Sequence, residues 1–159
     1  MSKLINNFSE YKEIKEDNFN ILLDAITNTS GKKVNQILLS DFILEEIDGY
    51  ELNHGIYVFK KDSEIKYIGK ASSRPFIERV PAHLDIRRNG WMNNMLKYLS
   101  EDSDPKNYLK ESLHVIENYE LLLVLFKTED CTKDKILEVE RCLIQSTPCI
   151  NKKKKTPSL

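Results

Sequence analysis

A β-hairpin predicted at residues 55–71 constrains the fold of this chain more than any other feature. Two short runs of Ile, Val, Phe and Tyr flank a polar link at residues 61–64, and Gly55 and Gly69 bracket the pair. Side chains of these types favour extended backbone, and a polar link between two such runs is typical of a hairpin. The pattern therefore predicts a small β-sheet with this hairpin as part of it.

Each predicted strand carries one tyrosine, Tyr57 in the first strand and Tyr67 in the second. Residues that face each other across a hairpin share one face of the sheet. Pairing of residues 59 and 65 would place the two hydroxyl groups side by side. The second strand runs on into a small basic loop at residues 69–74.

The composition is that of a soluble globular domain, with 40% hydrophobic and 31% charged residues. No apolar run approaches the roughly 18 residues that a membrane span needs, and the start of the chain lacks a signal-peptide pattern. We therefore expect a cytoplasmic protein. Cys131, Cys142 and Cys149 form no Cys-x-x-Cys pair. Small buried thiols are expected in place of a disulfide framework.

Charge is distributed unevenly along the chain. Residues 1–54 carry five lysines against ten acidic residues, whereas residues 55–159 carry 19 basic residues against 15 acidic ones. The basic excess begins at the hairpin and suits a polyanionic partner for the second part of the chain. The last segment, residues 152–159, is expected to be a disordered basic tail that either helps to hold phosphate or only keeps the chain soluble.

The first 50 residues predict a helical appendage to a domain that spans residues 51–151. Apolar residues three or four apart predict helices near residues 4–14, 19–26 and 34–47. These helices would pack on the domain, form a homodimer or cover the site. A DNA-reading helix-turn-helix is the remaining alternative, and the acidic balance of the segment argues against it.

After the hairpin the sequence predicts a short helix that carries Arg79 and His83, four residues apart and on one face. Pro81 should kink or end that helix, because proline has no backbone N–H to donate. A further helix is expected from Trp91. The nearly unbroken apolar run at residues 119–126 fits a central strand that is covered on both faces.

Glu140 is the residue of the last predicted helix that most needs an explanation. On a helical wheel it falls inside the apolar arc that Ile136 and Leu143 define, whereas Glu138 falls on the opposite side. An ionised carboxylate in that position is costly unless it pairs with a cation or a metal. The wheel leaves two alternatives open, a buried ion pair or a metal-binding or catalytic carboxylate.

Together these residue types suit the hydrolysis of a phosphodiester. A divalent ion on a carboxylate, with a guanidinium, can offset the charge that develops on the phosphate. A phenol or an imidazole can handle the proton of the attacking water. Each residue alone has an ordinary structural role, and only the combination indicates a site.

The order of these residues resembles that of the GIY-YIG endonuclease superfamily. Gly55–Tyr57 and Tyr67–Gly69 stand as the two halves of its motif, with nine residues between them. The resemblance spans about residues 54–151. The downstream matches, in order, are Arg79, His83, Glu140, Pro148 and Asn151.

The resemblance implies an α+β fold with a small three-stranded sheet, made of the hairpin and one central strand and flanked by helices. It also implies cleavage of DNA, or of RNA, with a single Mg or Mn ion. Glu140 looks like the metal ligand, and Arg79 looks like the residue that orients and neutralises the scissile phosphate. Tyr57 looks like the proton-handling group, assisted by Tyr67 and His83.

Three further residues are expected to contact substrate or support the site. Lys70 resembles a basic residue that some members carry just after the motif, and Asn151 resembles their late asparagine. The link before Arg79 is longer than in common members and holds the extra residues Arg74 and Pro75. A non-cleaving nucleic-acid-binding or regulatory module that kept the fold is the alternative function.

Overall fold

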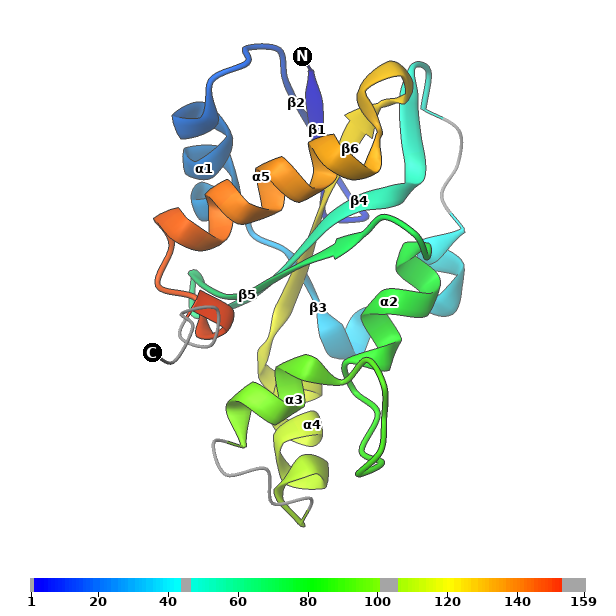
Figure 1. Ribbon diagram of the computed structural model, residues 1–159, viewed down its shortest axis with the longest axis vertical. Helices are drawn as coiled ribbons and strands as arrows, with labels where there is room; N and C mark the ends of the chain where they lie inside the picture. Colours follow the sequence, from blue (N-terminus) through cyan, green and yellow to red (C-terminus); the bar gives the residue numbers. More distant parts are fainter. Residues whose placement is uncertain (1, 44–46, 101–105, 153–159) are drawn as a thin grey trace.

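The computed structural model describes residues 2–43, 47–100 and 106–152 (Figure 1). Within these residues, six strands form one antiparallel sheet in the order β2-β1-β6-β4-β5, and β3 also pairs with β6. The strands are β1 (Lys3–Asn6), β2 (Tyr11–Ile14), β3 (Lys32–Lys33), β4 (Tyr50–Lys61), β5 (Glu64–Ala71) and β6 (Glu120–Lys127). The α-helices are α1 (Phe19–Asn28), α2 (Phe76–Ala82), α3 (Asn94–Leu99), α4 (Lys106–Asn118) and α5 (Lys133–Ser146). The 3-10 helices of the described residues are η1 (Val34–Gln36), η2 (Leu39–Phe42), η3 (Thr128–Asp130) and η4 (Ile150–Lys152).

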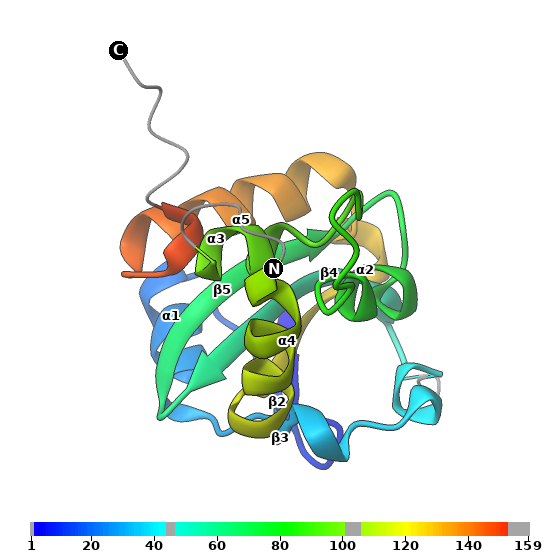
Figure 2. The same cartoon turned by 90° about the horizontal axis from the view of Figure 1, so that it is seen from below.

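The sheet separates two hydrophobic cores, because successive side chains of a strand point to opposite faces. Ile56 and Val58 of β4 belong to the core that α1 and α5 cover, whereas Tyr57 and Phe59 belong to the core of α2, α3 and α4. In Figure 1, α5 crosses in front of the sheet near α1, and α3 and α4 form the lower end. Figure 2 shows the molecule from below, with α4 seen from the side below α3. The hairpin therefore contributes to both cores.

The central strand β6 is confirmed at Glu120–Lys127. Its six apolar residues are each fully buried and alternate between the two cores. It pairs with β4 along one side and with β1 and β3 along the other. An unbroken apolar run is what such a doubly covered strand requires.

The expected three-stranded sheet with a helical N-terminal appendage is wrong. Residues 3–14 form β1 and β2, and β1 pairs directly with β6. Leu4 is buried in one core and Ile5 in the other, which is the two-faced burial of an inner strand. Asn7 stabilises the turn between the strands, since its Oδ1 accepts hydrogen bonds from two backbone N–H groups. The first helix expected here is therefore a pair of strands.

Of the other expected N-terminal helices, the one near residues 19–26 is confirmed as α1. The helix expected at residues 34–47 is wrong, because η1 and η2 occupy its described part, and residues 44–46 lie outside the described residues. Of the expected basic tail, residues 153–159 also lie outside them. None of the described helices is long and apolar enough to cross a membrane. The expectation of buried thiols holds for Cys149, whereas Cys142 is exposed.

Lys60 connects the hairpin to α1. Its side chain is 1% exposed, and Nζ donates to the backbone carbonyls of Ile26, Thr27 and Thr29 at 3.0, 3.0 and 2.8 Å. These carbonyls lie at the C-terminal end of α1, where a helix has unpaired acceptors and a partial negative charge. The buried ammonium group of Lys60 thus donates hydrogen bonds to carbonyl groups that the end of α1 would otherwise leave unpaired.

Lys60→Met is expected to lower the free energy of unfolding by about 3 kcal/mol, because it leaves these carbonyls without their charged donor. Urea denaturation followed by circular dichroism measures the change. Lys66→Met is the matched control, since Lys66 pairs with the exposed Glu64 on the same strand, and it should cost less than about 1 kcal/mol. Equal losses in the two variants would contradict the role assigned to Lys60.

Candidate active site

Tyr57 lies at the centre of the candidate site. It is fully buried on β4, and its ring lies against Gly69 of β5. A Cβ atom at position 69 would overlap the phenol ring, so only glycine leaves room for Tyr57. Gly55 meets a similar constraint, because a Cβ atom there would overlap the carbonyl oxygen of Val124 on β6. Close packing thus explains the first and last residues of the motif.

The register of the hairpin differs from the expected one. Tyr57 pairs with Gly69 and Phe59 pairs with Tyr67, with a β-bulge between Phe59 and Lys60. Asp62 and Ser63 form the turn with φ values of 50° and 66°, as in a two-residue hairpin turn of the primed type. The two tyrosines lie diagonally on the same face, and they are not directly opposite.

Arg79 binds the hairpin from α2. Its Nη2 donates to the Tyr57 hydroxyl oxygen at 3.3 Å, and its Nε donates to the Lys70 carbonyl at 3.3 Å. Two contacts on different strands hold the planar guanidinium in one orientation. Its side chain is only partly buried, so it can also meet a phosphate.

His83 contacts Tyr57 from the end of α2. The helix ends at Ala82, as the position of Pro81 predicts, and His83 follows it, 0% exposed. The His83 Nε2 atom lies 2.6 Å from the Tyr57 hydroxyl oxygen, and the Met95 backbone N–H donates to Nδ1 at 3.4 Å. A backbone N–H can only donate, so the ring proton of neutral His83 is assigned to Nε2, which donates to Tyr57.

Burial, with a smaller contribution from Arg79, lowers the pKa of His83 to about 3. His83 is therefore neutral at physiological pH. The Tyr57 oxygen accepts hydrogen bonds from both His83 and Arg79. Burial raises the pKa of Tyr57, opposed by Arg79 and reinforced by the charge of Glu140. Tyr57 is thus a neutral phenol whose oxygen is held by two donors.

Glu140 reaches this cluster from α5, on the opposite face of the sheet. Its burial is confirmed, with 7% of the residue exposed. The Lys70 Nζ atom lies 3.8 Å from one of its carboxylate oxygens. Burial is the main reason that the pKa values of Tyr57 and Tyr67 are raised, and the charge of Glu140 adds a small contribution to both. The site therefore involves both faces of the edge strand β5, with Tyr57 packed on Gly69 and Glu140 paired with Lys70.

Tyr67 and Asn151 line the same region. The Tyr67 ring packs against His83 with centroids 4.9 Å apart and against Tyr98 with centroids 6.1 Å apart, and burial raises its pKa. Asn151 Nδ2 donates to the Ile68 carbonyl of β5 at 2.6 Å. This bond ties the C-terminal segment to the edge strand. Both residues position the site through packing and backbone contacts.

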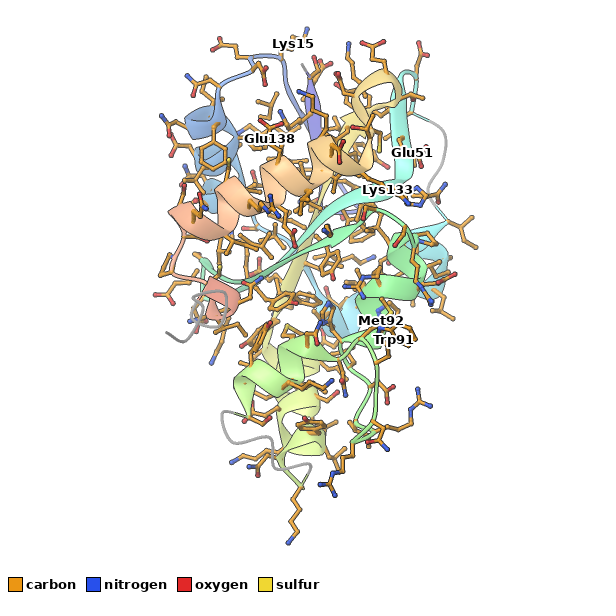
Figure 3. All side chains as sticks on the ribbon, in the orientation of Figure 1. Lys15, Glu51, Trp91, Met92, Lys133 and Glu138 are labelled. Atoms are coloured by element: carbon orange, nitrogen blue, oxygen red, sulfur yellow. The ribbon has the colours of Figure 1, made fainter. Side chains whose placement is uncertain are left out.

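Arg74 lies apart from the Tyr57 cluster. It is exposed, forms an ion pair with Glu78 at 3.6 Å and lies over the ring of Trp91 at 6.0 Å. Figure 3 labels Trp91 and Met92 on the loop beside α2. The helix expected from Trp91 begins only at Asn94, so Trp91 precedes it and remains exposed.

A pocket of about 250 Å³ joins this loop to the site. Its lining residues are Lys70, Ser72, Ser73, Arg74, Arg79, Trp91 and Met92. Sequence analysis alone did not place Trp91, Met92 or Tyr98 near the motif. The sequence offered one indication that Trp91 is exposed, its position directly after Gly90 in a loop.

No group of three or more His, Cys, Asp and Glu side chains suited to hold a metal occurs in the described part of the chain. Glu140 would therefore bind a divalent ion as its single carboxylate ligand from the protein. Mg²⁺ is commonly bound in this way, by one or two carboxylates together with water and substrate phosphate. The residues present fit such an ion and do not form an all-protein cage.

Comparisons with protein-family models, with curated proteins and with solved structures find no match for this chain. The functional assignment therefore depends on the residues and geometry described above.

Acidification is expected to destabilise the fold through His83. Its pKa is lowered from an ordinary 6.5 to about 3 in the folded chain, so between these values the unfolded chain binds more protons. Stability then falls as the pH falls through this window, by about 1 kcal/mol per pH unit. Denaturation at pH 7, 6 and 5 measures the slope.

His83→Gln removes the titrating group and is expected to flatten this slope. His114→Gln leaves His83 in place and should retain the slope of the wild type. The comparison concerns slopes, so a constant loss of stability in His83→Gln does not affect it. Parallel slopes in all three proteins would show that His83 does not cause the acid sensitivity.

Proposed function

We propose that this chain is a metal-dependent endonuclease of the GIY-YIG type that hydrolyses phosphodiester bonds in DNA. One observation carries the proposal: the Tyr57 hydroxyl group receives hydrogen bonds from both His83 and Arg79, and the buried Glu140 interacts with it electrostatically. A cytoplasmic location is part of the same proposal.

Arg79 is suited to bind the scissile phosphate. A guanidinium that is already oriented can stabilise charge that develops in the transition state without reorganising at that moment. The Lys70 carbonyl and the Tyr57 hydroxyl oxygen supply this orientation. Its remaining N–H groups are available to phosphate oxygens, because a guanidinium has five donors.

Tyr57 is proposed to accept the proton of the attacking water as a phenolate, which it becomes by first losing its hydroxyl proton to a water molecule. Burial opposes that form, since it raises the pKa of the phenol. The two donors on its oxygen favour it, because hydrogen bonds to a charged form stabilise that form. His83 supplies one of these two donors through its Nε2–H, and the Met95 backbone N–H fixes the tautomer of His83.

Glu140 would hold a single Mg or Mn ion. Such an ion would supply a Lewis acid that polarises a phosphate oxygen and lowers the pKa of bound water. The Lys70 ammonium group at 3.8 Å is loosely placed and partly exposed, so it can move to a phosphate oxygen when substrate binds.

The ion pair between Lys70 and Glu140 also favours a second candidate function. A buried carboxylate that already has a cation nearby needs no metal for its charge to be compensated. If the pair between Lys70 and Glu140 only stabilises the fold and holds no metal ion, the chain would bind nucleic acid without cutting it. Salt-sensitive binding without metal-dependent cleavage would support this alternative.

The test uses purified protein on supercoiled plasmid with Mg²⁺, with Mn²⁺ or with EDTA. We expect nicked and linear DNA only with a divalent ion. Glu140→Ala and Arg79→Ala, purified in the same way, should be inactive. Equal nicking by all three proteins would identify a contaminating nuclease and remove the support for this site.

A further inference from the structure

We propose that the pocket beside Arg79 is a nucleotide subsite in which Trp91 stacks on an unpaired base of the substrate. The inference rests on the proposed function and deepens it, because it names the form of nucleic acid that the site takes. Relaxed continuous duplex would be a poor substrate, whereas a single strand, a flap, a mismatch or the locally unpaired DNA of a supercoiled plasmid would be a good one.

Trp91 is presented to solvent by an ordered loop. The residue is 83% exposed, although tryptophan is ordinarily among the more buried residue types. Asn93, itself fully buried, donates to the carbonyls of Asp85 and Arg87 at 2.7 and 3.1 Å. A Cβ atom at Gly90 would lie 2.7 Å from the same amide group, so the loop closes tightly just before the indole.

The rest of the pocket suits a phosphate. Three cationic side chains, those of Lys70, Arg74 and Arg79, line it together with the hydroxyl groups of Ser72 and Ser73. Cations beside an exposed aromatic ring form the usual combination for single strands, in which bases stack on the ring and phosphates meet the charges. The pocket has a volume of about 250 Å³.

Arg74 and Arg79 connect the indole to the catalytic cluster. The Arg74 guanidinium lies 6.0 Å from the centre of the Trp91 ring, within the range of a cation–π contact. Arg79 lines the pocket and also contacts Tyr57. A nucleotide stacked on Trp91 would therefore lie next to the phosphate that Arg79 binds.

Base pairing decides which substrates can use this subsite. Inside a duplex, both faces of a base are covered by its neighbours in the stack, so an indole cannot reach them without unstacking the strand. An unpaired nucleotide presents its face at little cost. The exposed indole thus predicts selectivity for a distorted or single-stranded position.

Trp91 is the only tryptophan in the sequence, so intrinsic fluorescence reports directly on this subsite. The wild-type chain in EDTA is titrated with a thymidine hexamer, with an abasic hexamer of equal charge and with a 12-base-pair blunt duplex. We expect quenching by the thymidine hexamer, with about 10-fold tighter binding than the abasic one, and little quenching by the duplex. Equal quenching and affinity for the thymidine and abasic hexamers would overturn the proposal.

Variants separate stacking from charge, with binding measured by the anisotropy of labelled oligonucleotides. Trp91→Ala should weaken binding of the thymidine hexamer about 10-fold and leave the abasic hexamer unaffected, whereas Trp91→Phe should retain most of the affinity. Leu39→Ala is the control, an apolar side chain on η2 that is 71% exposed. Equal binding by Trp91→Ala and the wild type would refute the subsite.

The two proposals fail separately. Base-dependent quenching without any cleavage would retain the subsite and reject the nuclease. Cleavage that proceeds equally well on duplex and on unpaired substrates, with no base dependence of quenching, would retain the nuclease and reject the subsite.

Discussion

Glu140→Gln is expected to lower the rate of DNA cleavage about 10³-fold or more. The substitution removes a charge and keeps the size and shape of the side chain, so the packing of α5 on the sheet is preserved. The lost carboxylate is the proposed ligand of the divalent ion, and metal and transition-state electrostatics are usually the largest contributions to such a rate.

The fold of Glu140→Gln should remain intact. Its partner Lys70 has a side chain that is 35% exposed, so the freed ammonium group can be hydrated. We therefore expect the free energy of unfolding to change by less than about 1 kcal/mol. Single-turnover cleavage of a labelled oligonucleotide and thermal denaturation measure the two effects.

Glu138→Gln is the matched control for this prediction. Glu138 lies two residues before Glu140 on α5, carries a 66% exposed side chain and forms an ion pair with Lys135 at 3.9 Å (Figure 3). The same chemical change at this position should leave the cleavage rate within about twofold, because an exposed ion pair contributes little. Equal rates for the two variants would contradict the role of Glu140.

Arg79→Lys is expected to slow cleavage about 10²-fold to 10³-fold at saturating DNA, although it keeps the positive charge. The guanidinium of Arg79 contacts Tyr57 and the Lys70 carbonyl through two different nitrogens. A lysine ammonium group is a single point and cannot make both contacts while it binds a phosphate. We therefore expect Arg79→Lys to impair the orientation of the scissile phosphate more than it weakens the binding of DNA.

Single-turnover rates over a range of DNA concentrations separate the two effects. Arg141→Lys, at an exposed position on α5, is the control and should cleave like the wild type. An Arg79→Lys variant with weaker DNA binding and an unchanged maximal rate would limit Arg79 to a binding role. That result would contradict its place in the chemical step.

Local patterns predicted part of the fold. The run at residues 119–126 required burial on both faces, and it forms the centre of the sheet. Glu140 was predicted to be buried from the helical wheel alone, because a regular 14-residue helix follows that geometry closely. These features depend only on the period of one element and on its burial.

The N-terminal strands were not predictable in the same way. Leu4, Ile5 and Phe8 have a spacing that a helix also permits, and what makes residues 3–6 a strand is the free side of β6, more than 100 residues later. Pairing between distant segments overrides local spacing in such cases. The hairpin register also depended on the bulge after Phe59, which the alternation of residue types does not reveal.

The candidate site was partly predictable for the same reasons. Tyr57, Arg79 and His83 form one hydrogen-bonded network, as their joint presence suggested. The contribution of Met95 is a backbone N–H, which no side-chain pattern encodes. The position of Trp91 depends on loop closure at Gly90 and Asn93, so it required the three-dimensional structure.

The most direct test of the central claim is anomalous diffraction from crystals soaked with Mn²⁺ and an uncleavable phosphorothioate oligonucleotide. If Glu140 binds the divalent ion, we expect an anomalous peak at its carboxylate, with a phosphate between that peak and the Arg79 guanidinium. A peak elsewhere, or a bound oligonucleotide with Glu140 still paired to Lys70 and no ion beside it, would contradict a metal-dependent nuclease site.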